Sequence, residues 1–111
     1  MKEKILLDPH FRRMENIFAE RDLARLHAVA DVLWARDDPM PEAEIDRVRG
    51  DVVAVIAGGW RYGDVARWPK LRAILEVSGG FPSPASLDYG ACFARGIRVL
   101  SCAPAFGPAV A

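Results

Sequence analysis

The chain has 111 residues, which is enough for one domain with its own core and too few for two. Hydrophobic residues make up 51% of the sequence and charged residues 27%, a globular composition that excludes a disordered chain. Fifteen basic side chains balance fifteen acidic ones, so the basic excess that favours nucleic acid or an anionic membrane is missing, and we expect neither partner.

Short apolar runs are predicted to form five strands. In chain order they are residues 4–7, 31–35, Val52–Ala57, 71–77 and 97–102. The third run is apolar throughout and does not alternate with polar residues. This pattern is typical of a strand that is buried on both faces of a parallel sheet.

Helical patterns occupy the segments between these runs. Apolar residues recur at helical spacing between the first two strands, at Met14, Ile17, Phe18, Leu23, Leu26 and Ala30. Pro41 suits a first helical position and Gly50 the end of the same helix. Asp88 is predicted to cap a helix that runs through Arg95 and stops at Gly96.

Strands that alternate with helices predict a three-layer α/β fold with a parallel sheet and right-handed crossovers. At this size the simplest candidate is the flavodoxin-like strand order 2-1-3-4-5. Ligands bind such a sheet at the carboxyl ends of its strands, near the point where the strand order reverses.

Two glycine pairs lie at predicted strand ends, Gly58-Gly59 after the third strand and Gly79-Gly80 after the fourth. Successive main-chain amides in a turn such as Ser78-Gly79-Gly80 can converge on a carboxylate. A tight strand-to-helix turn is the alternative explanation of both pairs, and the residues alone favour it. His10, alone after the first strand, is predicted to be a turn residue rather than a catalytic one.

Three other sites are excluded by the same strand ends. A dinucleotide fingerprint needs a glycine where Trp60 stands between Gly59 and Gly63. A phosphoacceptor domain needs an aspartate after the third strand and a lysine after the fifth, and a flavin phosphate needs a hydroxyl-rich loop after the first. None of these residues is present.

The cysteines and the hydropathy of the chain indicate its environment. Cys92 and Cys102 have neither a CxxC spacing nor a histidine at ligand distance, so we expect two buried reduced thiols and no metal. No apolar run is long enough for a membrane span or for the core of a signal peptide. We therefore expect a soluble cytoplasmic protein.

The last thirteen residues, 99–111, carry no charge. A natural C-terminus is usually polar and solvated, so we expect further polypeptide to follow. On this interpretation residues 1–103 form the domain and residues 104–111 begin a linker.

From Asp51 onward the chain resembles the D-isomer-specific 2-hydroxyacid dehydrogenase family. Five pieces match in the family's order: the apolar strand 51–56; residues 68–74, similar to P-K-L-K-x-I; the turn Gly79-Gly80, similar to G-x-G-x-D-N; residues 87–88 with 94–99, similar to R-G-I-x-V; and residues 102–104 with 109–111, similar to N-x-P…V-A-E. Residues 81–86 depart from the family pattern, with a proline-containing insertion in place of G-x-D-N.

The resemblance implies the substrate-binding part of an oxidoreductase that interconverts a 2-hydroxy acid and a 2-oxo acid. In the family the second glycine turn binds the substrate carboxylate, which assigns Ser78, Gly79 and Gly80 as substrate-binding residues. The first turn, Gly58-Gly59-Trp60, is then a candidate cleft lining.

The same resemblance places the catalytic residues and the NAD or NADP site beyond residue 111. No catalytic or cofactor-binding residue is therefore assigned to the chain, and the isolated chain is expected to be inactive. It also implies a homodimeric full-length parent and a later helix that covers an apolar patch of this domain. The alternative is a stand-alone flavodoxin-like binding or interaction module without catalytic activity.

Overall fold

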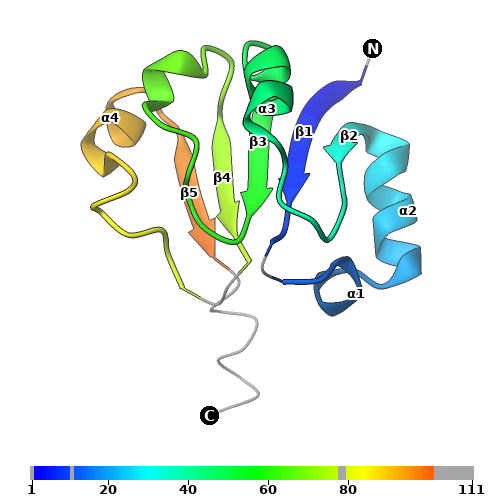
Figure 1. Cartoon of the computed structure of the whole chain (residues 1–111). Helices are drawn as coiled ribbons and strands as arrows, with labels where there is room; N and C mark the ends of the chain where they lie inside the picture. The colour runs from blue at the N-terminus through cyan, green and yellow to red at the C-terminus, as the bar shows by residue number, and fades with distance from the viewer. Residues whose placement is uncertain (1, 11, 78–79, 102–111) are drawn as a thin grey trace.

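The computed structural model describes residues 2–10, 12–77 and 80–101. Its centre is a parallel five-stranded sheet of order β2-β1-β3-β4-β5 (Figure 1). The strands are β1 (Glu3–Asp8), β2 (Ala30–Trp34), β3 (Val52–Ala57), β4 (Ala73–Glu76) and β5 (Arg98–Ser101). The predicted flavodoxin-like order is confirmed, and the strand order reverses between β1 and β3.

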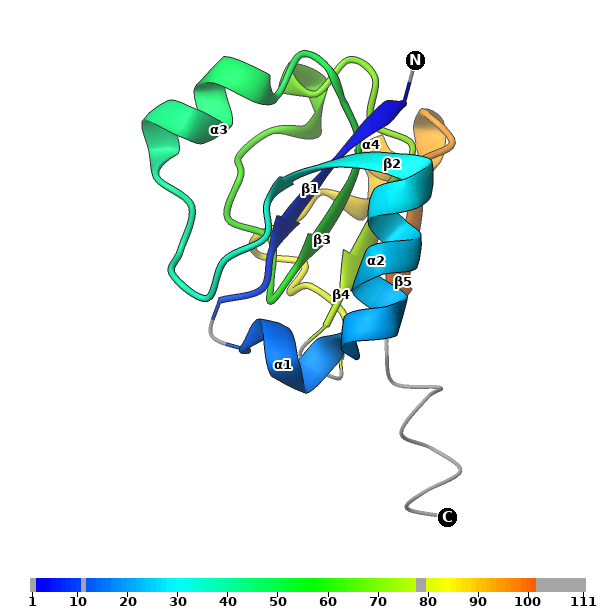
Figure 2. The same ribbon diagram turned by 90° about the vertical axis from the view of Figure 1, so that its right-hand side faces the viewer.

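Helices cover the sheet from two sides, and Figure 2 shows α2 and α3 on opposite sides of it. The helical elements are α1 (Met14–Ile17), α2 (Glu20–Val29), α3 (Glu42–Val48), the 3-10 turn η1 (Val65–Arg67) and α4 (Tyr89–Ala94). The larger core cluster joins α3, η1 and α4 to one face of the sheet. The smaller cluster joins α1 and α2 to the other face. None of the described helices has the length and apolar content that crossing a membrane requires.

The cover on the α1–α2 face thins toward β5. Leu7, Ile56, Leu75 and Leu100 are successive neighbours across β1, β3, β4 and β5. Leu7 is fully buried and Ile56 is 8% exposed, whereas Leu100 is 50% exposed. The core on this face therefore ends before the last strand, and an apolar side chain of β5 meets solvent.

The boundaries of α4 agree with the sequence signals. The side chain of Asp88 accepts a hydrogen bond from the Ala91 amide at 3.1 Å, as an N-cap should. Gly96 follows the helix with φ of +72°, the left-handed conformation that glycine adopts without strain.

The boundaries of α3 agree less well. Pro41 is the extended residue that precedes the helix rather than its first helical residue. The helix ends at Val48, with the Arg49 amide bonded to the Ile45 carbonyl. Gly50 follows this end as predicted, but its φ is not positive, so the helix end does not depend on the conformational freedom of glycine.

The connection between β3 and β4 contradicts the expectation that a helix lies in every crossover. It contains only η1, a single 3-10 turn. Gly59 and Gly63 have φ of +146° and +78°, which a continuous helix excludes. Tertiary packing of the aromatic side chains in this segment replaces the helix, as described below.

Candidate functional site

A pocket of about 400 Å³ lies at the carboxyl edge of the sheet, where β1, β3 and β4 end. It is lined by His10, Gly58, Gly59, Trp60, Arg61, Tyr62, Glu76, Phe81, Pro82, Ser83 and Ser86. We call it the strand-end pocket. Its position beside the reversal of strand order is the one at which ligands bind parallel α/β sheets.

The first glycine pair forms one wall of the strand-end pocket. A Cβ on Gly58 would lie 2.5 Å from the His10 carbonyl oxygen, so the loops after β1 and β3 approach each other closely only because this residue is glycine. Gly59 adopts φ of +146°, and its Cβ position lies 4.0 Å from Oε2 of Glu76. The structure thus brings the candidate cleft residues Gly58, Gly59 and Trp60 together in one pocket.

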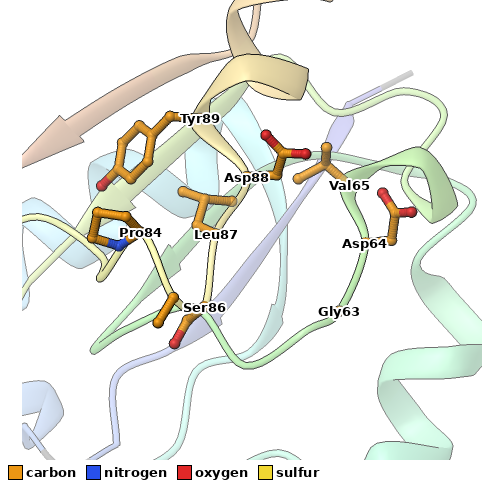
Figure 3. Close-up of a pocket in the computed structure, with 9 residues that line it drawn as sticks. Gly63, Asp64, Val65, Pro84, Ser86, Leu87, Asp88 and Tyr89 are labelled. Atoms are coloured by element: carbon orange, nitrogen blue, oxygen red, sulfur yellow. The ribbon is translucent and has the colours of Figure 1, made fainter.

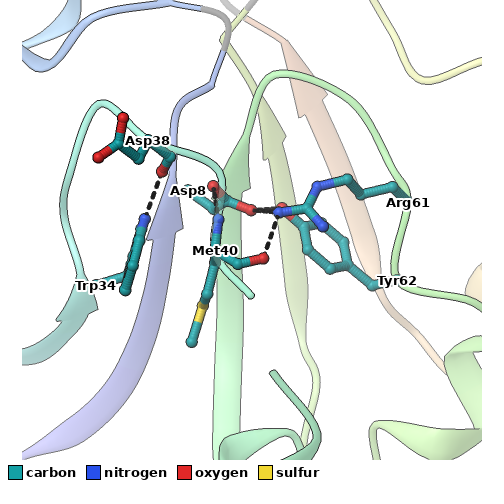
Figure 4. A network of polar contacts seen from close by, with 6 residues as sticks. All are labelled: Asp8, Trp34, Asp38, Met40, Arg61 and Tyr62. Atoms are coloured by element: carbon teal, nitrogen blue, oxygen red, sulfur yellow. Dashed lines mark hydrogen bonds and ion pairs between the residues drawn. The ribbon is translucent and has the colours of Figure 1, made fainter. Parts of the chain in front are cut away.

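A buried carboxylate fixes the loop that carries Arg61 and Tyr62 (Figure 4). Asp8, the last residue of β1, is 1% exposed. It accepts hydrogen bonds from the Tyr62 hydroxyl at 2.6 Å and from the Met40 amide at 3.1 Å, and it forms an ion pair with Arg61. Arg61 also donates to the Met40 carbonyl at 3.0 Å. The guanidinium is therefore held in one orientation at the wall of the pocket.

The same network affects the ionisation of Tyr62. Burial of the phenol raises its pKa, and the hydrogen bond to the Asp8 carboxylate raises it further. The neutral hydroxyl is the form that can donate this bond. Tyr62 is therefore a structural donor to Asp8 rather than a proton acceptor.

Three aromatic side chains, Trp60, Tyr62 and Trp68, pack against one another at this wall of the pocket. The centroid of Trp60 lies 5.1 Å from that of Tyr62 and 5.7 Å from that of Trp68. Their polar atoms bond to the main chain, Trp60 Nε1 to the Gly63 carbonyl at 2.7 Å and Trp68 Nε1 to the Tyr62 carbonyl at 3.2 Å. Edge-to-face packing of Trp60 on Tyr62 and tilted packing of Trp60 on Trp68 stabilise a loop that has no α-helix.

The predicted carboxylate-binding turn is only partly described. Ser78 and Gly79 lie outside the described residues, so their assignment stays a prediction. Gly80 is exposed, and a Cβ added there would meet no atom within 4 Å. Glu76, two residues before the turn, and Phe81, directly after it, both line the strand-end pocket.

Four polar residues of this region are absent from the sequence-based site assignment: Asp8, Arg61, Tyr62 and Glu76. The rule that ligands bind at strand ends selects the loops that contain Asp8 and Arg61 but gives neither residue a role. Glu76 is the last residue of β4, one position before the end of the strand predicted over residues 71–77, so the same rule passes over it. No sequence signal pairs Asp8 with Arg61, because 53 positions separate them.

A larger pocket, of about 650 Å³, lies between η1 and α4 (Figure 3). Its two carboxylates belong to Asp64 and Asp88, which cap η1 and α4. They accept hydrogen bonds from the Ala66 amide at 2.9 Å and the Ala91 amide at 3.1 Å. Because these acceptors already stabilise helix ends, the strand-end pocket is the better candidate despite its smaller volume.

The described residues do not fit a dinucleotide. The turn after β3 leads into a loop instead of a helix, and Trp60, 5% exposed, fills the position of the middle glycine. Within the described ranges no three His, Cys, Asp or Glu side chains form a group that could hold a metal ion. Cys92 is a buried free thiol whose pKa is raised by burial, and Cys102 lies outside the described residues.

Of the comparisons with known proteins, the one with solved structures found a match. No family model matches the chain, and no curated protein matches its sequence. Among solved structures, one described as the crystal structure of a phosphoglycerate oxidoreductase from Rhizobium etli is similar, with a TM-score of 0.76 and 25% identity. The match covers 95% of this chain and 32% of that one, so this chain spans about a third of the neighbour's length. The chain is therefore similar to one part of a longer oxidoreductase.

Proposed function

We propose that the chain is the substrate-binding part of an oxidoreductase that interconverts a small 2-hydroxy acid and the corresponding 2-oxo acid. The observation that carries the proposal is the similarity to the R. etli oxidoreductase over 95% of this chain. In this proposal the amides of Ser78, Gly79 and Gly80 bind the substrate carboxylate. Gly58, Gly59 and Trp60 line the cleft beside it.

The redox chemistry comes from NAD or NADP, held by polypeptide outside these 111 residues. We place the cofactor outside the chain because the described residues do not fit a dinucleotide. The chain itself supplies binding and orientation: a rigid wall after β3, the oriented Arg61 and amide donors after β4. Without a positioned nicotinamide the chain binds the acid and does not transform it.

Binding to the isolated chain tests the first half of the proposal. Titration of ¹⁵N-labelled protein with lactate or pyruvate should shift the amide signals of residues 58–61 and 78–81. Propane-1,2-diol is the matched control, because it replaces the carboxylate of lactate with an uncharged group. The proposal is wrong if neither acid shifts these signals, or if the diol shifts them equally. Turnover of NADH and pyruvate by the isolated chain at ordinary enzyme rates would refute its inactivity.

A stand-alone binding module is the second candidate, and the observation that favours it is the chain's own core. Among the described residues, sixteen buried side chains of this chain form the larger core cluster. The coding sequence after codon 111 separates the candidates. We expect an open reading frame that contains G-x-G-x-x-G, whereas a stop codon would favour the module.

A further inference from the structure

A third pocket, of about 290 Å³, lies between α3 and the segment that connects β3 to η1. It adjoins the strand-end pocket, because Arg61 and Tyr62 line both. Three of its seven lining residues are arginines, Arg49, Arg61 and Arg67, and one, Glu42, is acidic. We call it the arginine pocket.

Two of these arginines have ion-pair partners that do not line the pocket. Arg49 directly follows α3 and pairs with Asp46, and its side chain is only 12% exposed. Arg61 pairs with Asp8, the buried last residue of β1. Neither carboxylate is among the residues that line the arginine pocket. The two guanidinium groups are therefore held at the pocket by anions that lie outside its lining.

The third arginine has no such partner. Within the described part of the chain, the side chain of Arg67 forms no hydrogen bond and no ion pair. Burial lowers the pKa of Arg49, and the charge of Arg67 lowers it further, against the opposing effect of Glu42. Two cations that repel each other thus line one small pocket. An anion bound there would replace this repulsion with attraction to both.

We propose that the arginine pocket is a binding site for a phosphate group, either on a small molecule or as the free ion. Guanidinium groups present paired N–H donors that match the oxygens of phosphate. A phosphate monoester carries about two negative charges and three terminal oxygens, which suits donors from three arginines better than a carboxylate does. The inference is independent of the proposed function, since Arg49 and Arg67 do not line the strand-end pocket.

The experiment is a titration of the ¹⁵N-labelled 111-residue chain with inorganic phosphate, at an ionic strength held constant with chloride. Phosphate should cause saturable shifts of the amide signals of residues 49 and 61–67, with a dissociation constant of about 1 mM or less. Acetate should bind at least about fivefold more weakly, because it carries one charge. Glycerol 3-phosphate distinguishes the two sources: tighter binding than inorganic phosphate would assign a phosphorylated small molecule, and weaker binding the free ion.

Three variants test the residues that carry the inference. Arg67→Gln removes the guanidinium that has no partner, so the affinity for phosphate should fall by about fivefold or more. Arg47→Gln is the matched control, because Arg47 lies on α3, pairs with Glu44 and does not line the pocket. It should change the affinity by less than about twofold. Glu42→Gln removes the acidic lining residue and should tighten binding by about twofold or more, a gain that a poorly folded variant cannot produce.

Several results would overturn the inference. One is the absence of saturable shifts at residues 49 and 67, and another is binding of acetate as tightly as phosphate. A third is an equal loss of affinity in Arg67→Gln and Arg47→Gln, which would indicate unspecific attraction to surface charge. Shifts confined to residues 58, 59 and 81 would place phosphate in the strand-end pocket instead. If Arg67→Gln does not fold, Glu42→Gln decides, and an affinity no higher than that of the wild type overturns the inference.

Discussion

The contact between Gly58 and His10 gives the sharpest test of how the strand-end pocket is built. In Gly58→Ala the new Cβ would lie 2.5 Å from the His10 carbonyl oxygen and 3.2 Å from the Pro9 carbonyl oxygen. Both neighbours are main-chain atoms, so no side chain can rotate away. The loop after β1 must retreat by about 0.9 Å to restore an ordinary contact.

The expected cost of Gly58→Ala follows from this overlap. Overpacking of a well-packed site costs about 1–3 kcal/mol. For a domain of this size that loss lowers the melting temperature by about 4–15 °C. The displaced loop also carries the pocket wall, so affinity for small acids should fall with the stability.

Gly50→Ala is the matched control for the same chemical change. A Cβ at Gly50 would meet nothing within 4 Å, and its φ is not positive. Alanine there reduces the entropy of the unfolded chain and should stabilise the fold by about 0.4–1 kcal/mol. Thermal unfolding followed by circular dichroism compares the two variants. A Gly58→Ala melting temperature equal to that of the wild type, or a similar loss in Gly50→Ala, would refute the close-approach argument.

Three further predictions concern the hydrogen-bond network of Asp8 and the half-exposed Leu100 on β5. Asp8→Ala removes the acceptor that Arg61 and Tyr62 share. It should cost about 2–3 kcal/mol in urea unfolding, because the buried Tyr62 hydroxyl loses its partner, whereas the half-exposed Arg61 keeps the Met40 carbonyl and water. Loss of the exposed cap in Asp64→Ala should cost about 1 kcal/mol, and equal losses in the two variants would contradict the first value. The pKa of Tyr62 in the folded state lies above its ordinary value of 10.0. The free energy of unfolding should therefore fall as the pH rises above 10.0, because Tyr62 then loses its proton more readily in the unfolded chain. Urea midpoints measured over this pH range should fall less in Tyr62→Phe than in the wild type. The wild type should bind an apolar dye at the face where Leu100 is half exposed, and Leu100→Lys should weaken the fluorescence; an unchanged signal would place the dye elsewhere.

The fold was largely predictable because its signals are local. The apolar run 52–57 and the capped helix before Gly96 each occur where the sequence places them. The strand order was predicted as the simplest one for a parallel α/β domain of this size, and the sheet confirms it. The crossover between β3 and β4 was not predictable, because it depends on tertiary contacts of Trp60 with Trp68 rather than on a periodic pattern.

The strand end at which the site lies was predictable from the sequence, but the polar groups that form the site were not. The glycine pair Gly58-Gly59 marks the correct strand end, since glycine is the signal of close backbone approach. The partners of Asp8 become apparent only when the sheet register places β1 beside β3. Glu76 lies inside the predicted strand 71–77, and hydropathy does not show which residue of a strand faces a pocket.

Because Trp60 lines the strand-end pocket, ligand binding there can be followed by tryptophan fluorescence. Trp60 lines the pocket and contacts the buried Trp68, whereas the third tryptophan, Trp34, lies on β2 with its indole bonded to the Asp38 carbonyl. Indole emission depends on local polarity and quenching, so a ligand that displaces water from Trp60 should change the intrinsic fluorescence of the chain. Occupancy can then be followed without a label, and substitution of Trp34 by phenylalanine would remove the background from outside the site.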